Sequence, residues 1–309
     1  MARTAVGLLL AFVSIVTSEP VCRANETPGQ ALVRFGARTG PSALAVWPNY
    51  TAQTKERQTK NPFTYVVVGT NWNGGVEGLK YLKALPGVRG VMFSHPGFGD
   101  EWCECLRGMT GLEELYVLGK RFTDVGAAEL KDVTKLECLS LTSTKITDAG
   151  MENLKRMTRL KRLSLAVSWG VTDKGFAYVP VKELRWLNLD GTSVSGDSML
   201  RLRKATNLEW LRESGQPFIG VNGAVEFREV DAGLRHLKGL KHLKYVSVHD
   251  MPVTEGEMKE LLAHATELAY VELGDAIFSR EGFQPRDRAD AVNKALKRIK
   301  DQARDAAKH

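Results

Sequence analysis

Apolar residues recur along the chain in a phrase of the form Leu-x-x-Leu-x-Leu. Three clear copies span Leu136–Leu141, Leu160–Leu165 and Leu184–Leu189, and they follow one another at a constant interval. Looser copies extend the series in both directions, so that nine phrases start at residues 63, 88, 112, 136, 160, 184, 208, 243 and 268. Because alternate residues of an extended segment point to opposite sides, each phrase predicts one strand with a buried apolar side.

A second phrase, Thr-Asp-x-Gly, follows the first one in step, at Thr123–Gly126, Thr147–Gly150 and Thr172–Gly175. The threonine hydroxyl can cap free amides at the start of a helix, and the aspartate lies at the positive end of the helix dipole. One unit is therefore a strand, a loop and a short helix. Such a unit cannot bury its own apolar side, so neighbouring units are expected to stack around one continuous core.

The two phrases together resemble leucine-rich-repeat proteins of the ribonuclease-inhibitor-like group, most closely the secreted ones common in planctomycete bacteria. The resemblance covers about residues 63–274, the expected repeat domain. It implies an α/β solenoid, a horseshoe or arc with a parallel concave sheet and short helices on the convex side. It also implies binding of other macromolecules through the concave face, without shared catalytic residues. The chain departs from the family at Thr144 and Thr192, where most members carry an asparagine that ties adjacent turns together.

Residues 1–24 have the pattern of a secretory signal peptide. Arg3 precedes the twelve residues Ala5–Val16, and Pro20 follows them. Cleavage after Ser18 or after Ala24 satisfies the small-residue rule, and we prefer the second site. Twelve apolar residues fall short of the roughly 17 to 25 that span a bilayer. We expect a secreted protein, extracellular or periplasmic, with no stable transmembrane span. The alternative is an intracellular adaptor that keeps its leader.

The two ends of the repeat series and one long interval depart from the regular pattern. Residues 25–62 contain four prolines, which predicts an irregular N-terminal cap over the first repeat. Residues 275–309 are assigned to a basic amphipathic C-terminal helix, since 286–308 lack Gly and Pro and carry eight bases against four acids. The interval between the strands that start at 208 and 243 is longer than all the others, which predicts an inserted loop at 212–229 beside the concave rim.

Alternation places the residues that flank the second leucine of each phrase on the concave surface, in two columns. In the C-terminal half, four successive positions of the first column are aromatic. Trp, Tyr and Arg are enriched at interface hot spots, although aromatic side chains on adjacent strands also stabilise a sheet by stacking. Eight residues of the two columns are the predicted ligand-binding residues: Trp186, Trp210, Tyr245, Tyr270, Arg162, Arg212, Tyr116 and Asn188.

Composition and motifs narrow the choice of function. The 309 residues are 43% hydrophobic and 26% charged, which excludes a wholly disordered or multi-span membrane protein. The net charge of +7 modestly favours anionic partners, but the interspersed acids and bases are more typical of a solvated mixed-charge surface, and we expect no nucleic-acid partner. No His-Glu-x-x-His, Gly-x-Ser-x-Gly or phosphate-loop motif is present, so we expect no enzyme, no cofactor and no metal site.

The favoured ligand is therefore a protein or peptide held on the concave face. The alternative ligand is a carbohydrate or cell-surface polymer, because a row of aromatic rings also suits stacking on sugars. Sugar sites need carboxylates and amides beside the rings, and here these are limited to Glu114, Asn188, Asp190 and Glu272. This scarcity favours the protein or peptide.

Removal of a leader that contains Cys22 leaves Cys103, Cys105 and Cys138. This number is odd, so at least one thiol is unpaired within the chain. We expect Cys103 to fill the core and Cys105 to lie on the surface. Cys138 is expected to be exposed on the concave face as an ordinary thiol, because no histidine on a neighbouring strand is placed to act as its base.

Overall fold

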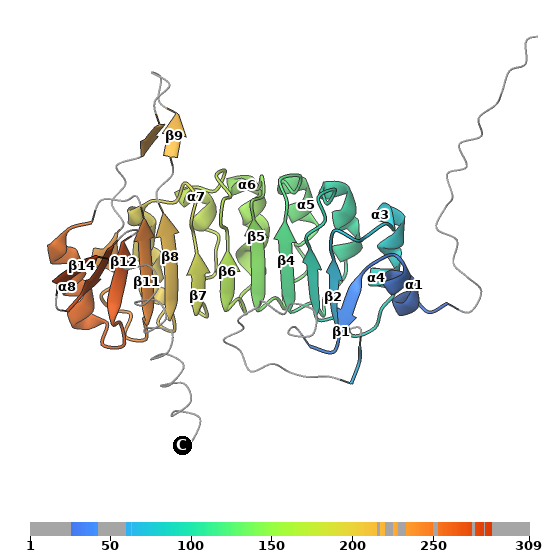
Figure 1. Ribbon diagram of the computed structural model, residues 1–309, viewed down its shortest axis with the longest axis horizontal. Coiled ribbons are helices and arrows are strands. Elements are labelled where there is room, and N and C mark those ends of the chain that lie inside the picture. The colour runs from blue at the N-terminus through green and yellow to red at the C-terminus, as the bar shows by residue number, and fades with distance from the viewer. Residues whose placement is uncertain are drawn as a thin grey trace, which may run out of the picture.

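The computed structural model describes residues 26–42, 60–62, 64–214, 217–219, 225–227, 233–249, 253–273, 276–280 and 282–285. Within these ranges, nine strands pair in parallel in one sheet, each inside or directly beside one of the nine repeated phrases. Antiparallel strands extend the sheet at both ends (Figure 1). The parallel strands are β2 (Tyr65–Val68), β3 (Gly90–Phe93), β4 (Glu114–Leu118), β5 (Cys138–Thr142), β6 (Arg162–Ser164), β7 (Trp186–Asn188), β8 (Trp210–Ser214), β11 (Tyr245–His249) and β12 (Tyr270–Leu273).

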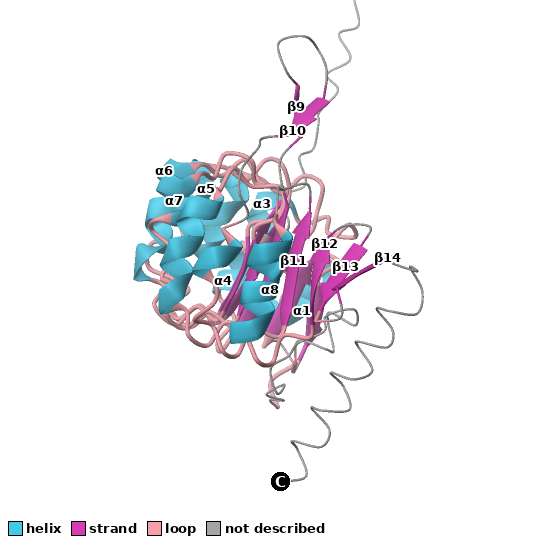
Figure 2. Cartoon of the chain, turned by 90° about the vertical axis from the view of Figure 1, so that its left-hand side faces the viewer, coloured by secondary structure: helices cyan, strands magenta, loops and turns pink. Residues whose placement is uncertain are grey.

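Short helices connect the strands and lie together on one side of the sheet (Figure 2). We call the opposite face of the sheet the concave face. This arrangement confirms the predicted α/β architecture of a parallel sheet with short helices on the convex side. The helical segments are α3 (Gly75–Gly78), α4 (Lys80–Lys83), η1 (Asp100–Leu106), α5 (Asp124–Ala128), α6 (Asp148–Met151), η2 (Glu152–Arg156), α7 (Asp173–Phe176), η3 (Gly196–Lys204), η4 (Leu234–His236) and α8 (Glu255–His264).

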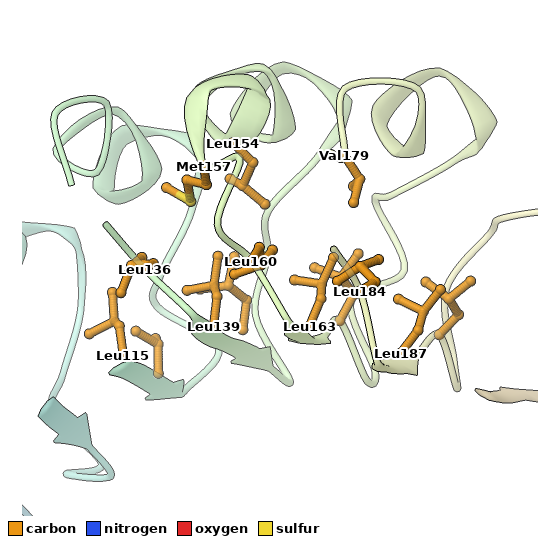
Figure 3. Close-up of a cluster of buried hydrophobic side chains, with 14 of the residues drawn as sticks. Leu115, Leu136, Leu139, Leu154, Met157, Leu160, Leu163, Val179, Leu184 and Leu187 are labelled. Atoms are coloured by element: carbon orange, nitrogen blue, oxygen red, sulfur yellow. The ribbon is translucent and has the colours of Figure 1, made fainter. Parts of the chain in front are cut away.

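The core lies between the sheet and the helices and is continuous through the repeats. The second leucine of each phrase, such as Leu139, Leu163 and Leu187, is fully buried and points from its strand toward the helical side (Figure 3). Leu154 and Val179 approach the same layer from the helical side. Each repeat thus buries its apolar side against its neighbours, as the stacking argument requires.

A row of aspartates joins each repeat to the next. The carboxylate of Asp148 accepts the N–H of Thr172 at 2.7 Å, the hydroxyl of Thr172 at 2.7 Å and the N–H of Gly175 at 2.9 Å. The Thr hydroxyl also caps its own helix, as predicted, by accepting the N–H of Lys174 at 3.2 Å. The aspartate of Thr-Asp-x-Gly therefore serves the following repeat as well as the start of its own helix. We call four residues the aspartate ladder: Asp100, Asp124, Asp148 and Asp173.

Hydroxyl side chains replace the asparagines of the family pattern. Thr144, Ser168 and Thr192 are buried and occupy equivalent positions in three successive repeats. Thr192 donates to the carbonyl of Leu189 at 2.8 Å, and Ser168 donates to the carbonyl of Leu141 in the preceding repeat at 2.7 Å. These hydroxyls therefore bond backbone carbonyls at the positions where the resemblance predicts asparagine.

The described part of the N-terminal cap contains a helix and a strand within residues 26–42, which corrects the expectation of irregular structure there, while residues 43–59 lie outside the described residues. Helix α1 (Pro28–Arg34) begins with Thr27 and Gln30 in a reciprocal capping box, and strand β1 (Arg38–Gly40) pairs antiparallel with β2. Proline at the first helical position keeps the helix intact, because that residue needs no N–H partner. The ring of Phe35 packs against Trp72 and Tyr81 and closes the core at this end.

At the other end, residues 276–279 and 282–285 form two strands, which corrects the assignment of this part of 275–309 to a helix. Strand β13 (Ala276–Ser279) pairs antiparallel with β12, and β14 (Gly282–Pro285) pairs antiparallel with β13. The helical prediction rested on residues 286–308, which lie outside the described residues, as do the leader 1–24 and residue 275 itself.

The insertion at 212–229 contains a second hairpin. Strands β9 (Pro217–Ile219) and β10 (Val225–Phe227) pair with each other and extend beyond the edge at which the parallel strands end (Figures 1 and 2). Strand β8 includes the first three residues of the predicted insertion, Arg212–Ser214, and pairs with β11 along its length.

Candidate binding site on the concave face

The register of the sheet places the predicted binding residues in two columns. Arg162, Trp186, Trp210 and Tyr245 are direct cross-strand neighbours from β6 to β11. In the second column, Ser164, Asn188, Arg212 and Ser247 follow in the same way. Tyr116 lies in that second column on β4, and Tyr270 begins β12. The eight predicted residues therefore share one face, with Tyr116 separated from the others by β5.

Three aromatic rings of the first column form a continuous stack. The rings of Trp186 and Trp210 lie 4.8 Å apart at 10°, and those of Trp210 and Tyr245 lie 4.6 Å apart at 9°. The guanidinium of Arg162 lies 5.5 Å from the centroid of the Trp186 ring. We call Trp186, Trp210 and Tyr245 the aromatic stack. The side chains of the two tryptophans and the tyrosine are half-buried.

Stacking determines which part of each ring a ligand can reach. Both faces of Trp210 are covered, by Trp186 on one side and Tyr245 on the other. Near-parallel rings on adjacent strands leave their edges, rather than their faces, for contact with a ligand. Sugars stack on ring faces, whereas apolar and carbonyl groups of a polypeptide also pack against ring edges. The geometry thus suits a polypeptide better than a sugar ring.

Two polar residues of the second column are already engaged within the protein. Asn188 accepts the backbone N–H of Asp190 at 2.8 Å. Arg212 is paired with the carboxylate of Asp190. Both side chains are half-buried, so they shape the surface around the stack and hold the end of β7.

Polar groups surround a carboxylate in the N-terminal half of the face. Glu114 Oε1 accepts the hydroxyl of Tyr65 at 3.5 Å, and Oε2 accepts that of Tyr116 at 3.4 Å. Burial raises the pKa of Glu114 to about 7, against the opposing field of Arg162. Burial and the nearby Glu114 charge raise the pKa of Tyr65 to about 12, so this phenol stays protonated.

The cysteines differ from two of the three expectations. Cys105 is buried rather than on the surface, and burial raises the pKa of its thiol to about 12. Cys138 is 6% exposed rather than freely exposed, with Sγ 3.0 Å from the hydroxyl of Tyr116. Cys103 is buried as expected.

Two further carboxylates of the sheet are buried, and one of them, Glu213, occupies a position that the repeat pattern reserves for an apolar residue. Glu213 faces the core from β8, opposite Val248 of β11, and is 2% exposed. Neither of its oxygens has a hydrogen-bond partner among the described residues. Burial raises the pKa of Glu213 to about 8, with the charges of Asp190 and Asp173 adding to the effect. Glu272 is 6% exposed and accepts the hydroxyl of Tyr245 at the end of the aromatic stack.

The rim of the sheet exposes a tryptophan that the strand pattern does not identify. Trp169 is 64% exposed in the loop after β6, two residues beyond Val167, which has a left-handed φ of 59°. A β-branched residue in that conformation stores strain. Arg121, Lys145 and Trp169 follow one another at the interval of the repeat, but they lie outside the leucine phrase, so the strand pattern gave no signal for them.

The described residues contain no cluster of three or more His, Cys, Asp or Glu arranged to hold a metal ion. No helix among them is long and apolar enough to cross a membrane.

Comparison with solved structures identifies the fold. No protein-family model and no curated protein matches the chain. Among solved structures, an internalin (InlF) from Listeria monocytogenes is similar over 79% of this chain and 71% of that chain, at 16% identity and a TM-score of 0.51. The fold is a leucine-rich-repeat solenoid. Internalin C2 of the same bacterium is similar over 76% of this leucine-rich-repeat chain and 97% of the internalin C2 chain, at 16% identity and a TM-score of 0.48. A leucine-rich-repeat protein from Leptospira interrogans covers 63% of this chain and 44% of its own, at 17% identity and a TM-score of 0.40.

Proposed function

We propose that this leucine-rich-repeat solenoid is a non-enzymatic module that binds a protein or peptide across its concave face. The observation that carries the proposal is the aromatic stack, which concentrates two tryptophans and a tyrosine on three adjacent strands. Large rigid side chains of this kind contribute contact area at a small entropic cost. Tyr270 and Arg162 extend the same column on either side, and Tyr116, Asn188 and Arg212 flank it.

The rest of the face supports a polypeptide ligand rather than a sugar. A carbohydrate site would place ring faces toward solvent, and the inner ring of the stack has both faces covered. The strained and exposed rim at Val167 and Trp169 adds apolar surface beside the face. We also propose that the protein is exported, on the basis of the leader pattern of residues 1–24.

Affinity capture tests the proposed function. The purified chain and a Trp186→Ala/Trp210→Ala double variant are compared as baits against extracellular protein and polysaccharide fractions, after circular dichroism has verified that both are folded. The matched control is Tyr178→Ala, which removes an aromatic side chain that is 40% exposed after helix α7 on the helical side. We expect a protein that the wild type and the control retain and the double variant loses. A ligand retained equally by all three baits contradicts the proposal, and a retained glycan reassigns the ligand class.

A further inference from the structure

Glu114 is a carboxylate on the concave face that lacks a positively charged neighbour at contact distance. Its two hydrogen bonds, from Tyr65 at 3.5 Å and Tyr116 at 3.4 Å, lie beyond the usual range for a hydroxyl donor. Among the ion pairs of the described ranges, none includes Glu114. This contrasts with the neighbouring Glu113, which pairs with Arg89.

The surroundings of Glu114 are shaped for contact from the concave side. Tyr65 reaches Glu114 across β3, where the residue between them in the column is Gly90. Tyr116 and Met92 are partly buried and pack against the cluster of Tyr65 and Val67, so an apolar floor lies beside the carboxylate. Aromatic rings next to a carboxylate suit the methylene stem and the cationic head of a lysine or arginine.

Glu114 also lies in line with the aromatic stack. Its column continues through Cys138 and Arg162 to Trp186, three strands away. Three strand spacings of about 4.8 Å make roughly 14 Å, which an extended segment covers in about four residues.

We propose that Glu114 binds a lysine or arginine side chain of the polypeptide segment that the concave face holds, while residues about four positions away contact the aromatic stack. The inference rests on the proposed function and adds the charge and the spacing of the ligand. Its physical basis is that a half-buried carboxylate without a cation keeps part of the cost of its desolvation, and a ligand cation offsets that cost.

The inference implies that binding strengthens as the pH rises through neutrality. The carboxyl of Glu114, with its pKa raised to about 7, is mostly protonated at pH 6 and mostly ionised at pH 8. A ligand cation binds the ionised form, so affinity increases over that interval. The other titratable or charged groups that act on Glu114 are Tyr65, Glu113, Tyr116 and Arg162.

Selection from a displayed library of random dodecapeptides tests the inference on the full chain. We expect wild-type selections to be enriched in Lys or Arg at one position, about four residues from apolar or aromatic positions. Glu114→Gln should lose the basic preference and keep the apolar one. The matched control is Glu183→Gln, which makes the same charge change at an exposed residue outside the two columns and should select as the wild type does.

Binding of one selected peptide then tests the inference without altering the protein. A version with the basic residue replaced by Gln should bind the wild type roughly tenfold more weakly at pH 8. The two versions should bind almost equally at pH 6. This comparison remains decisive if Glu114→Gln fails to fold.

The outcomes separate the two proposals. Peptides that depend on Trp186 and Trp210 but show no basic preference overturn the role of Glu114 and leave the proposed function standing. Selection that the Trp186→Ala/Trp210→Ala variant does not change overturns both. A basic preference that survives Glu114→Gln also overturns the role assigned to this residue.

Discussion

Carboxylates in the aspartate ladder and on the concave face differ in how many hydrogen bonds they accept and in how short these bonds are. In the aspartate ladder, each carboxylate accepts three hydrogen bonds from the next repeat, as Asp124 does from Thr147 and Gly150 at 2.6 to 3.0 Å. On the concave face, Glu114 accepts two long bonds. A fully bonded carboxylate holds structure together, whereas a partly bonded one keeps capacity for another partner.

The core supplies a third case, a carboxylate with no hydrogen bond among the described residues. Glu213 faces the core at the last regular strand before the insertion, with no hydrogen bond to either oxygen among the described residues. It replaces the leucine, valine or phenylalanine that the other repeats place there, and it makes the free energy of unfolding depend on pH. We therefore expect removal of a carboxylate to change the free energy of unfolding differently in the aspartate ladder and in the core.

Removal of a ladder aspartate should have the largest effect. Asp148→Ala deletes the acceptor of three hydrogen bonds and leaves the N–H groups of Thr172 and Gly175 without their partner. We expect the free energy of unfolding to fall by about 3 kcal/mol in urea denaturation. Asp132→Ala, at an exposed residue, should change it by less than about 0.5 kcal/mol. Equal effects at the two positions would contradict a structural role for the ladder.

The ladder also explains the glycine of Thr-Asp-x-Gly. A Cβ at Gly126 would lie 2.6 Å from Asp100 Oδ1 and 2.8 Å from Cε2 of the buried Phe122. Asp100 is held by three hydrogen bonds, so it cannot move away freely. We expect Gly126→Ala to lower the free energy of unfolding by about 2 kcal/mol in urea denaturation.

Gly239→Ala is the matched control for that prediction. Nothing lies within 4 Å of a Cβ built at Gly239, so its substitution should be nearly neutral. A stable Gly126→Ala protein would show that the ladder has room to shift and would weaken the contrast with the concave face.

The sequence predicted the parallel sheet and the helix caps because both depend on local patterns that recur in every repeat. It did not predict the hydrogen-bond partners of the ladder aspartates, because these partners belong to the next repeat. The phrase Thr-Asp-x-Gly looks the same in the sequence whether or not its aspartate contacts the next repeat. The prolines of the N-terminal cap argued against helix α1, although Thr27 and Gln30 form a capping box that the sequence shows.

The concave columns were predicted residue by residue, since alternation fixes which side chains share a face. Their exposure was not predicted, because it depends on contacts between strands. Stacking half-buries Trp186 and Trp210, and Tyr116 covers the short side chain of Cys138. Glu213 was visible as a missing third leucine in its phrase, but its burial required the register with β11.

Replacement of Glu213 should raise stability in a manner that depends on pH. Its pKa is raised from 4.5 in an unfolded chain to about 8 in the folded protein, so the folded state favours the protonated acid. The stability contributed by this group is complete below pH 4.5 and is lost as the pH rises toward 8. We expect Glu213→Leu to raise the free energy of unfolding by about 2 kcal/mol at pH 8 and by less at pH 5.

Denaturation of wild type and variant at both pH values measures the difference. Glu209→Leu, at a half-buried residue outside the core whose carboxylate pairs with Arg185 and Lys244, should show no such gain. A pH-independent effect of Glu213→Leu would mean that the carboxyl is not titrating in this interval.

The smallest effect on stability is expected within the aromatic stack, and it separates binding from sheet stabilisation. Trp210→Ala removes two ring contacts and should lower the free energy of unfolding by about 1 to 2 kcal/mol, while Trp210→Phe keeps an aromatic ring in the stack and should cost less than about 1 kcal/mol. If the stack binds a polypeptide, Trp210→Ala should weaken capture of the retained ligand about tenfold or more while the protein stays folded. Full capture by the folded Trp210→Ala protein would mean that the aromatic stack stabilises the sheet and does not bind the ligand. The stack would then have a structural role, as the aspartate ladder has.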